Sequence, residues 1–268
     1  MSLKSASRPA PAVQPAPLDR LSALLAGLSP RVWLSEGSAE LGMHIARPSA
    51  GSEAARGCWL TVTPRGQKLD TDALHGRGLA PWLSFEVALD GPVGPLFQEQ
   101  FREPLDIALD EADAALGQIT RLIAGEVQTP RCGHPLLMNR AGDILLIGLL
   151  RHLVASPRGR MHLFNGLADP RMARALVAMH THPGFPWSVA ALAQEAGMSR
   201  TSFAQHFRAV VGMAPVGYLA RLRLALAKKR VQDGVGLKQA ARETGYAGPS
   251  TLSRALHRAQ AQTQACTQ

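Results

Sequence analysis

The second half of the chain carries apolar residues at helical spacing, interrupted at short intervals by Pro, Gly and capping residues. A first helix is predicted to begin at Asp169-Pro170, because Asp is a favoured cap and Pro suits the first helical turn. Met172, Leu176 and Met179 would form its apolar face. Further helices are predicted at about 189–196, 200–210, 215–232, 237–244 and 249–259, followed by a frayed polar tail at 260–268.

The N-terminal half has a different pattern. After leucines at helical spacing from Leu18 to Leu28, short apolar stretches broken by Gly and Pro continue to about Phe101. Such stretches predict strands separated by turns, and hence a small sheet or barrel. The strands are expected around 31–34, 58–62 and 82–89.

An apolar run after Pro104 has the spacing of a coiled-coil seam, which predicts a helix. Its members are Leu105, Leu109, Ala112, Leu116, Ile119 and Ile123. This helix would lie along a partner helix from a second subunit or pack against the adjacent helix or sheet, and fewer than three heptads leave both open. The apolar segment from His134 to Ala155 is its expected neighbour.

A break rich in Pro, Gly and Arg at residues 156–160 is the predicted domain boundary. At 268 residues the chain is long enough for two domains with separate cores. The sequence therefore predicts an α+β protein with a small β-barrel domain and flanking helices at 18–155, a linker at 156–168 and an all-α domain at 169–259. Residues 1–17, rich in Ala and Pro, are interpreted as a disordered tail and not a signal peptide.

The basic charge is concentrated in the second domain. From Arg158 onward there are 15 Lys and Arg against 4 Asp and Glu, whereas the first 157 residues carry a net charge of −2. A concentrated positive field is expected of a surface that binds phosphates, although a solvated basic face gives the same count. Charge alone does not separate these interpretations.

Cysteine and histidine patterns do not point to catalysis or to a metal. Cys58, Cys132 and Cys266 have no metal-like spacing, and an odd count fits a reducing cytoplasm better than a disulfide framework. A Cys132–His134 nucleophile would lack an orienting third group. His180 and His182, two residues apart on a helix, do not face one another. No cofactor, metal or catalytic residue is therefore predicted, and no apolar run is long enough to span a bilayer.

One small pattern occurs twice in the last hundred residues: a short helix with an Ala, a Gly turn, and a second helix with apolar residues four apart. This is typical of a helix-turn-helix, in which Ala lets two helices cross closely and Gly adopts a turn conformation that other residues resist. Two tandem units indicate DNA binding. The first copy is Ala193, Gly197, Phe203 and Phe207, and the second is Ala241, Gly245, Leu252 and Leu256.

Candidate DNA-contacting residues follow from which side of each second helix remains free. Arg can bind guanine with two hydrogen bonds and Gln can do the same to adenine. His206 is interpreted as a partly buried neighbour of the Phe side, with DNA contact as the alternative. The DNA-binding candidates are Ser199, which also caps its helix, Arg200, Thr201, Gln205 and Arg208 in the first unit, and Ser250, Thr251, Arg254 and Arg258 in the second.

Lys228, Lys229 and Arg230 cluster near the end of the helix that joins the two units. They are candidates for phosphate contacts. The helix dipole also favours basic residues at a C-terminus, so both explanations stay open.

The stretch from Asp169 to Arg258 resembles the C-terminal domain of AraC/XylS-type transcriptional regulators. The resemblance implies tandem units that bind successive major-groove segments about one helical turn, roughly 34 Å, apart. Leu252 and Leu256 stand where the family usually has Phe, and this departure predicts that the second unit is less well packed and contributes less to base reading. The resemblance is carried by Trp187, Leu192-Ala193, Ala196 to Arg200, Phe203, Phe207-Arg208, Val211 to Pro215, Tyr218-Leu219, Arg223, Ala227, Gly245-Tyr246 and Ser253 to Leu256.

The N-terminal half more loosely resembles the cupin-like sensor domain of a subgroup of these regulators. The residues are Pro81-Trp82-Leu83, Arg131-Cys132-Gly133 and Leu149 to Leu153. This resemblance implies a barrel that holds a small effector and helices used for homodimerisation. RNA polymerase is an expected further partner of such a regulator. The metal-binding cupin pattern is absent from this region of the sequence.

The leading interpretation is a cytoplasmic, sequence-specific transcriptional regulator and not an enzyme. Two alternatives are an architectural DNA binder without sequence preference and, less favoured, a cupin-type enzyme with a DNA-binding appendage.

Overall fold

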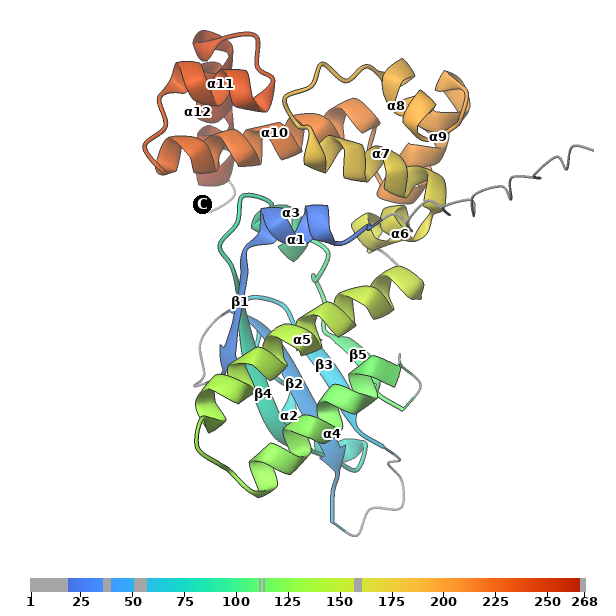
Figure 1. The fold of residues 1–268 in the computed structure, drawn as a ribbon, viewed down its shortest axis with the longest axis vertical. Coiled ribbons are helices and arrows are strands. Elements are labelled where there is room, and N and C mark those ends of the chain that lie inside the picture. Colours follow the sequence, from blue (N-terminus) through green and yellow to red (C-terminus); the bar gives the residue numbers. More distant parts are fainter. Residues whose placement is uncertain are drawn as a thin grey trace, which may run out of the picture.

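The computed structural model describes residues 19–35, 40–50, 57–110, 112, 114–156 and 161–265. The predicted tail at 1–17 and Cys266 lie outside the described residues. A sheet domain and a helical domain are stacked along the long axis of the molecule (Figure 1), which confirms the predicted two-domain α+β fold.

The sheet domain contains five antiparallel strands in the order β1-β4-β2-β3-β5, with β1 and β5 at its two edges among the described residues. Each central strand alternates in the direction of its side chains, and the face carrying Met43, Leu60 and Phe85 is buried. The strands are β1 (Pro30–Leu34), β2 (Leu41–Pro48), β3 (Trp59–Thr63), β4 (Leu79–Leu89) and β5 (Leu105–Ala108).

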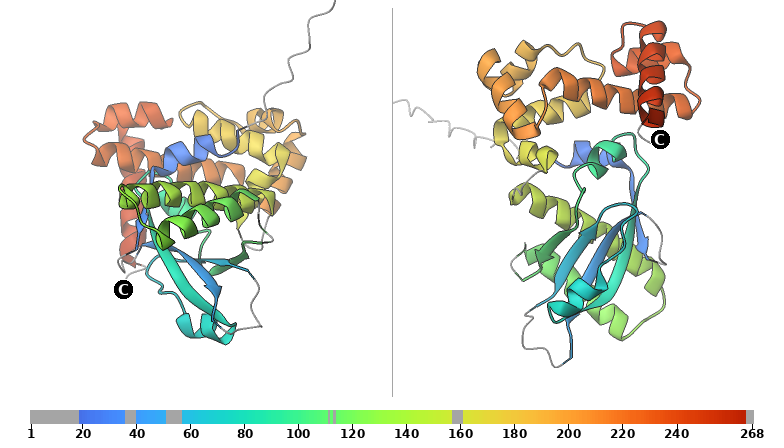
Figure 2. Two further views of the ribbon diagram at one scale, coloured as in Figure 1. Left: turned by 60° about the horizontal axis from the view of Figure 1, so that its bottom comes forward. Right: turned by 180° about the vertical axis from the view of Figure 1, so that it is seen from behind.

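Two long helices cover that apolar face of the sheet, α4 (Ala114–Gln128) and α5 (His134–Ala155) (Figure 1). Close approach depends on Gly142 of α5, where an added Cβ would lie 2.6 Å from Cγ1 of Val32. The view from behind shows the opposite face of the sheet (Figure 2). The shorter helices of this domain are α1 (Ser22–Leu28), α2 (Thr71–Gly76) and α3 (Gly94–Gln98).

The opposite face of the sheet carries a polar network on neighbouring strands. His44 contacts the Ser84 hydroxyl through Nδ1 at 2.8 Å and the Thr63 hydroxyl through Nε2 at 2.9 Å. The Thr61 hydroxyl donates to Asp106 at 2.6 Å. Burial lowers the pKa of His44, which favours its neutral form.

The predicted helix from Pro104 to Ile123 is wrong in its first half. Leu105 and Ile107 belong to strand β5, and helix α4 begins only at Ala114. Leu105, Ile107 and Leu109 are also spaced two residues apart, as in a strand. This segment becomes β5 because the edge of β3 is open for it to pair with. In α4, Leu116 and Ile123 are fully buried within the protomer. These seam positions are therefore used inside one subunit.

The helical domain follows the predicted order, with two corrections. Helix α6 (His162–Ala168) occupies part of the predicted linker, and α12 continues to Ala265 where a frayed tail was predicted from residue 260. The last residues are mostly Ala and Gln, which are good helix formers. The remaining helices are α7 (Pro170–Thr181), α8 (Val189–Glu195), α9 (Arg200–Val211), α10 (Pro215–Gln232), α11 (Leu237–Thr244) and α12 (Pro249–Ala265).

The two domains meet at an aromatic cluster. Phe164 of α6 packs edge-on against Phe97 and Phe101, with ring centroids 5.5 and 6.1 Å apart. Glu99 and Arg221 form an ion pair across the junction; both side chains are over a third exposed, so apolar packing carries more of the stability than this pair. A cavity of about 910 Å³ beside the pair is lined from both domains.

No single helix in the described ranges is long and apolar enough to cross a membrane. Helices α9 and α10 reach that length and apolar composition only when they are taken together as one bent pair.

Candidate nucleic-acid interface

The first helix-turn-helix unit consists of α8 and α9, joined by a tight turn. Gly197 has φ +63°, a left-handed conformation that suits glycine. The Ser199 hydroxyl accepts a hydrogen bond from the Ser202 amide at 3.3 Å and so caps α9, as the sequence predicts. Its hydroxyl is thereby engaged in the fold.

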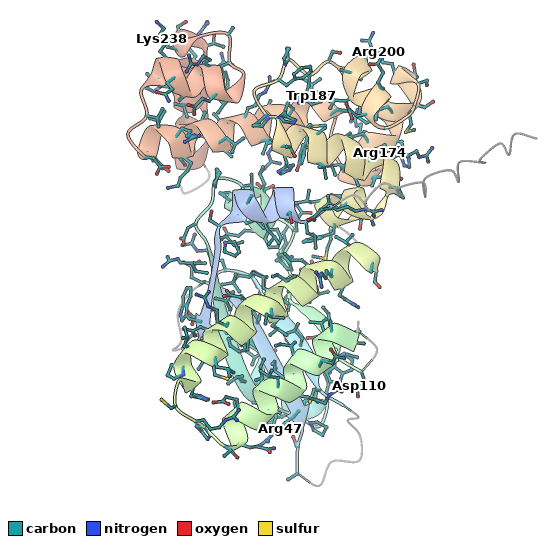
Figure 3. All side chains as sticks on the ribbon, in the orientation of Figure 1. Arg47, Asp110, Arg174, Trp187, Arg200 and Lys238 are labelled. Atoms are coloured by element: carbon teal, nitrogen blue, oxygen red, sulfur yellow. The ribbon has the colours of Figure 1, made fainter. Side chains whose placement is uncertain are left out.

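Helix α9 divides into a buried and an exposed side. Phe203 and Phe207 are fully buried, with ring centroids 5.5 Å apart, and Phe207 also packs edge-on against Tyr218 of α10. The candidates on the other side are all exposed: Arg200, Thr201, Gln205 and Arg208. Arg200 lies at the end of the helical domain remote from the sheet (Figure 3). The predicted division of this helix is confirmed.

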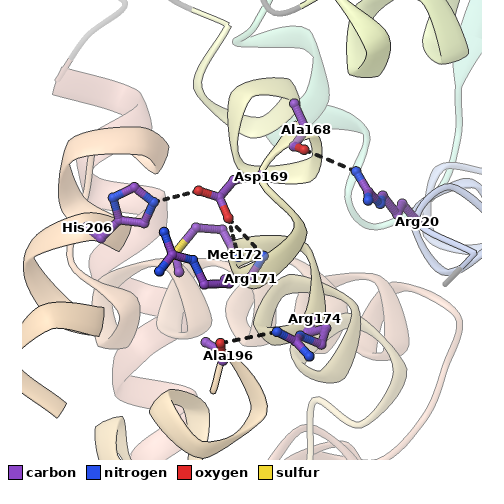
Figure 4. Close-up of polar contacts among 8 residues, drawn as sticks. All are labelled: Arg20, Ala168, Asp169, Arg171, Met172, Arg174, Ala196 and His206. Atoms are coloured by element: carbon purple, nitrogen blue, oxygen red, sulfur yellow. Dashed lines mark hydrogen bonds and ion pairs between the residues drawn. The ribbon is translucent and has the colours of Figure 1, made fainter. Parts of the chain in front are cut away.

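His206 is turned toward the protein. Its Nε2 lies 2.5 Å from the Asp169 carboxylate, which also accepts from the backbone amides of Arg171 and Met172 and so caps α7 (Figure 4). Although burial opposes it, the hydrogen bond from His206 helps to hold the pKa of Asp169 below its ordinary value. His206 thus ties α9 to the start of α7, and the interpretation as a structural neighbour is favoured over DNA contact.

The second unit has a smaller core. Its buried cluster in the described residues consists of Ala227, Ala240, Ala241 and Leu252, with Leu256 only partly buried. Three alanines bury little apolar surface, so this unit is held more weakly than the first. The candidates Ser250, Thr251, Arg254 and Arg258 are exposed on α12.

Two of the three basic residues at the end of α10 are engaged in ion pairs. Lys229 contacts Asp233 at 2.6 Å, and Arg230 contacts Glu243 of α11 at 3.1 Å. Lys228 is exposed. Of the three phosphate candidates, Lys228 needs no rearrangement of these ion pairs to reach DNA.

Helices α9 and α12 lie at opposite ends of α10 (Figures 1 and 2). An 18-residue helix is about 27 Å long at 1.5 Å per residue. That length is of the order of one turn of a DNA duplex, so α10 is suited to spacing α9 and α12 along one face of DNA.

The His and Cys residues considered for chemistry lie in different environments. His180 contacts the Tyr218 hydroxyl at 2.6 Å inside the protein, while His182 is exposed. Burial raises the pKa of the Cys58 thiol, which disfavours the thiolate. His134 contacts Glu126 rather than Cys132. Within the described ranges no group of three or more His, Cys, Asp or Glu residues could hold a metal ion.

Sequence reasoning missed the arginines that bind backbone carbonyls. Arg174 of α7 donates to the Ala196 carbonyl at 3.4 Å, at the turn of the first unit (Figure 4). Arg223 of α10 donates to two carbonyls of the loop between α7 and α8. Such contacts leave no local pattern, because the acceptor is main chain and lies far away in the sequence.

Two family comparisons divide the chain in the same way. Residues 192–263 match a family described as a helix-turn-helix domain, and residues 43–155 match a family described as cupin. The two matches fall on the α8–α12 region and on the sheet domain with its two covering helices.

Similar proteins include transcription regulators. A putative AraC-like transcription regulator of Streptomyces lividans is 38% identical over 46% of this chain and 41% of its own length. The HTH-type transcriptional regulator AlkR of Acinetobacter baylyi is 31% identical over 51% of this chain and 45% of its own. The chain thus matches less than half the length of these curated relatives. A solved structure of ToxT from Vibrio cholerae aligns over 85% of this chain and 89% of its own, with 9% identity and a TM-score of 0.37.

Proposed function

We propose that this chain is an AraC-type transcriptional regulator with an N-terminal cupin domain, and that it binds DNA sequence-specifically in the cytoplasm. The observation that carries the proposal is the pair of helix-turn-helix units at the two ends of α10, each with exposed Arg and polar side chains on its second helix. We call α9 and α12 the reading helices. Each would enter one of two successive major-groove segments.

Control of DNA binding would pass through the domain junction. A small effector in the cavity beside Glu99 and Arg221 would contact both domains. If it binds one arrangement of the domains more tightly than another, it shifts the population toward that arrangement and changes DNA affinity. RNA polymerase is the proposed partner at the promoter.

The test is selection of bound sequences from a random duplex library at about 150 mM salt. The wild type is expected to recover a motif with two unequal halves about one helical turn apart. Arg200→Ala and Arg254→Ala should each weaken discrimination in a different half by about 1–3 kcal/mol, because each removes a side chain able to bond a guanine edge twice. The Arg200 half is expected to be the stronger, since its helix has the larger core.

Arg65→Ala is the matched control, because it removes the same charge from an exposed site in the sheet domain. It should leave the motif unchanged. Recovery of no motif, with binding lost smoothly as salt rises, would instead support an architectural binder.

We also propose that the chain forms a homodimer through the outer side of the α4–α5 hairpin. Leu122, Leu136 and Ile144 on these helices are each more than half exposed. Burying such side chains against a second copy would remove apolar surface from water. Light scattering should give twice the 28.6 kDa chain mass for the wild type and the single mass for Leu122→Lys/Ile144→Lys. Gln128→Lys, an exposed change on the same hairpin, should leave the dimer intact, and a monomeric wild type would refute the proposal.

A further inference from the structure

The two helix-turn-helix units have separate hydrophobic cores. Phe203 and Phe207 of the first unit belong to the large buried cluster, which also contains Leu222 of α10. Ala227, five residues further along α10, belongs with Leu252 to the small cluster of the second unit. In the described residues no buried apolar cluster therefore joins the two units, and their relative orientation depends on α10 and on polar contacts.

One polar contact links the middle of α10 to the loop that leads into the first unit. The Arg223 guanidinium donates from Nε to the Pro183 carbonyl at 2.8 Å and from Nη2 to the Phe185 carbonyl at 2.6 Å. Both acceptors lie in the loop of residues 182–187, which connects α7 to α8 and runs beside the end of α11 (Figures 1 and 2). A planar guanidinium that makes two such bonds fixes direction as well as distance.

The same guanidinium lies against the turn of the second unit. Gly245, the turn glycine before α12, has φ +77°, and an added Cβ there would be 2.9 Å from Cζ of Arg223 and 3.0 Å from the Gly184 carbonyl oxygen. A Cβ on Gly184 would in turn lie 2.6 Å from the Glu243 carbonyl oxygen at the end of α11. The 182–187 loop, Arg223 and the second turn are thus packed in direct contact.

The loop itself is held in shape by contacts of its own. The Trp187 indole donates to the His182 carbonyl at 2.9 Å, and its ring packs on Phe185 with centroids 4.5 Å apart. Trp187 lies where this loop returns toward α8 (Figure 3). Because the loop has a fixed shape, its attachment to Arg223 restricts the position of the first unit. A flexible loop would leave that unit free to move.

We propose that Arg223 and the 182–187 loop clamp the first unit to the second and thereby set the spacing between the two half-sites that the protein reads. This inference rests on the proposed function, since it concerns how the two reading helices are held together on DNA. When two binding modules are held at the correct separation, the second binds at high effective concentration. Loosening the clamp lowers that concentration without changing a single contact to bases.

The variant is Arg223→Met, which keeps a long side chain and loses all donors, beside Arg223→Lys, which can restore one of the two bonds. Affinity is measured for the selected full site, for sites with the spacer lengthened or shortened by one base pair, and for each half-site alone. Arg223→Met should bind the full site about tenfold more weakly and discriminate less among spacers, with half-site affinities unchanged. Arg223→Lys should fall between the wild type and Arg223→Met.

The half-sites control for the lost charge, since a general electrostatic loss would weaken half-sites and full site alike. Equal weakening of binding to the full site and to both half-sites, with the spacer preference intact, would overturn the clamp.

A DNA-free measurement separates this failure from failure of the proposed function. Spin labels at Gln205→Cys and Thr251→Cys, with the three native cysteines replaced by serine, should give a broader distance distribution in Arg223→Met than in its parent. An unchanged distribution would overturn the clamp even if the wild type proves to be a regulator.

Discussion

Replacing Phe203 by alanine should lower the free energy of unfolding by about 3–5 kcal/mol, the range for removing a fully buried aromatic side chain. Phe203 is 0% exposed and packs on Phe207. The buried cluster that contains it continues through α6 to the sheet domain. The loss of stability should therefore extend over the first unit and the domain junction, and most of the chain should unfold at a lower denaturant concentration.

Leu252→Ala is the contrasting variant. Leu252 is also 0% exposed, but it belongs to the small separate cluster of the second unit. This substitution should lower the free energy of local unfolding of the second unit by about 2–5 kcal/mol. Amide-exchange protection should be lost in α11 and α12 only. In Phe203→Ala, the amides of α11 and α12 should stay protected from exchange for longer than those of α9. If both variants melted the chain as one unit with equal shifts, the separation of the cores would be wrong.

Acid should destabilise the protein through His180 before it protonates the carboxylates. Burial lowers the pKa of this histidine to about 4, from an ordinary value of 6.5. Between these two values the unfolded chain binds a proton that the folded chain does not. The stability that neutral His180 contributes is therefore fully present above pH 6.5 and is lost as the pH falls toward 4, at about 1.4 kcal/mol per pH unit.

His180→Gln tests this, because glutamine can still hydrogen-bond the Tyr218 hydroxyl but does not titrate. Urea unfolding from pH 7.5 to 4 should show a shallower decline in the free energy of unfolding for the variant. His44, whose pKa is also lowered by burial, is present in both proteins and cancels in the comparison. Parallel curves for the two proteins would show that His180 does not carry the pH dependence.

Local chemistry explains why the helical domain could be predicted closely. The caps at Asp169 and Ser199 act within three residues, and the structure has both of them bonding the first turn of their helices. The division of α9 into buried Phe and exposed polar residues follows from helical periodicity alone. Such features depend on residues that are close in the sequence, so they can be predicted without knowledge of the fold.

The apolar run after Pro104 shows where this reasoning stops. Its spacing fits a helix, and only the open edge of β3 makes residues 105–108 a strand. Leu116 and Ile123 likewise fit a dimer seam, but both are fully buried within the protomer, where their helix α4 packs on α5. Periodicity states that one side is buried without stating what buries it.

The sequence by itself determined the two-domain order, the helices from α7 to α11 with the caps at Asp169 and Ser199, the two turn glycines and which side chains of the reading helices face outward, because most of these follow from interactions within a few residues. Only the tertiary structure decided that His206 binds Asp169, that His180 contacts the Tyr218 hydroxyl, and that Arg223 holds the 182–187 loop against the second unit. These contacts join residues about 37 to 40 positions apart. Their partners are chosen by packing, and no spacing in the sequence encodes them.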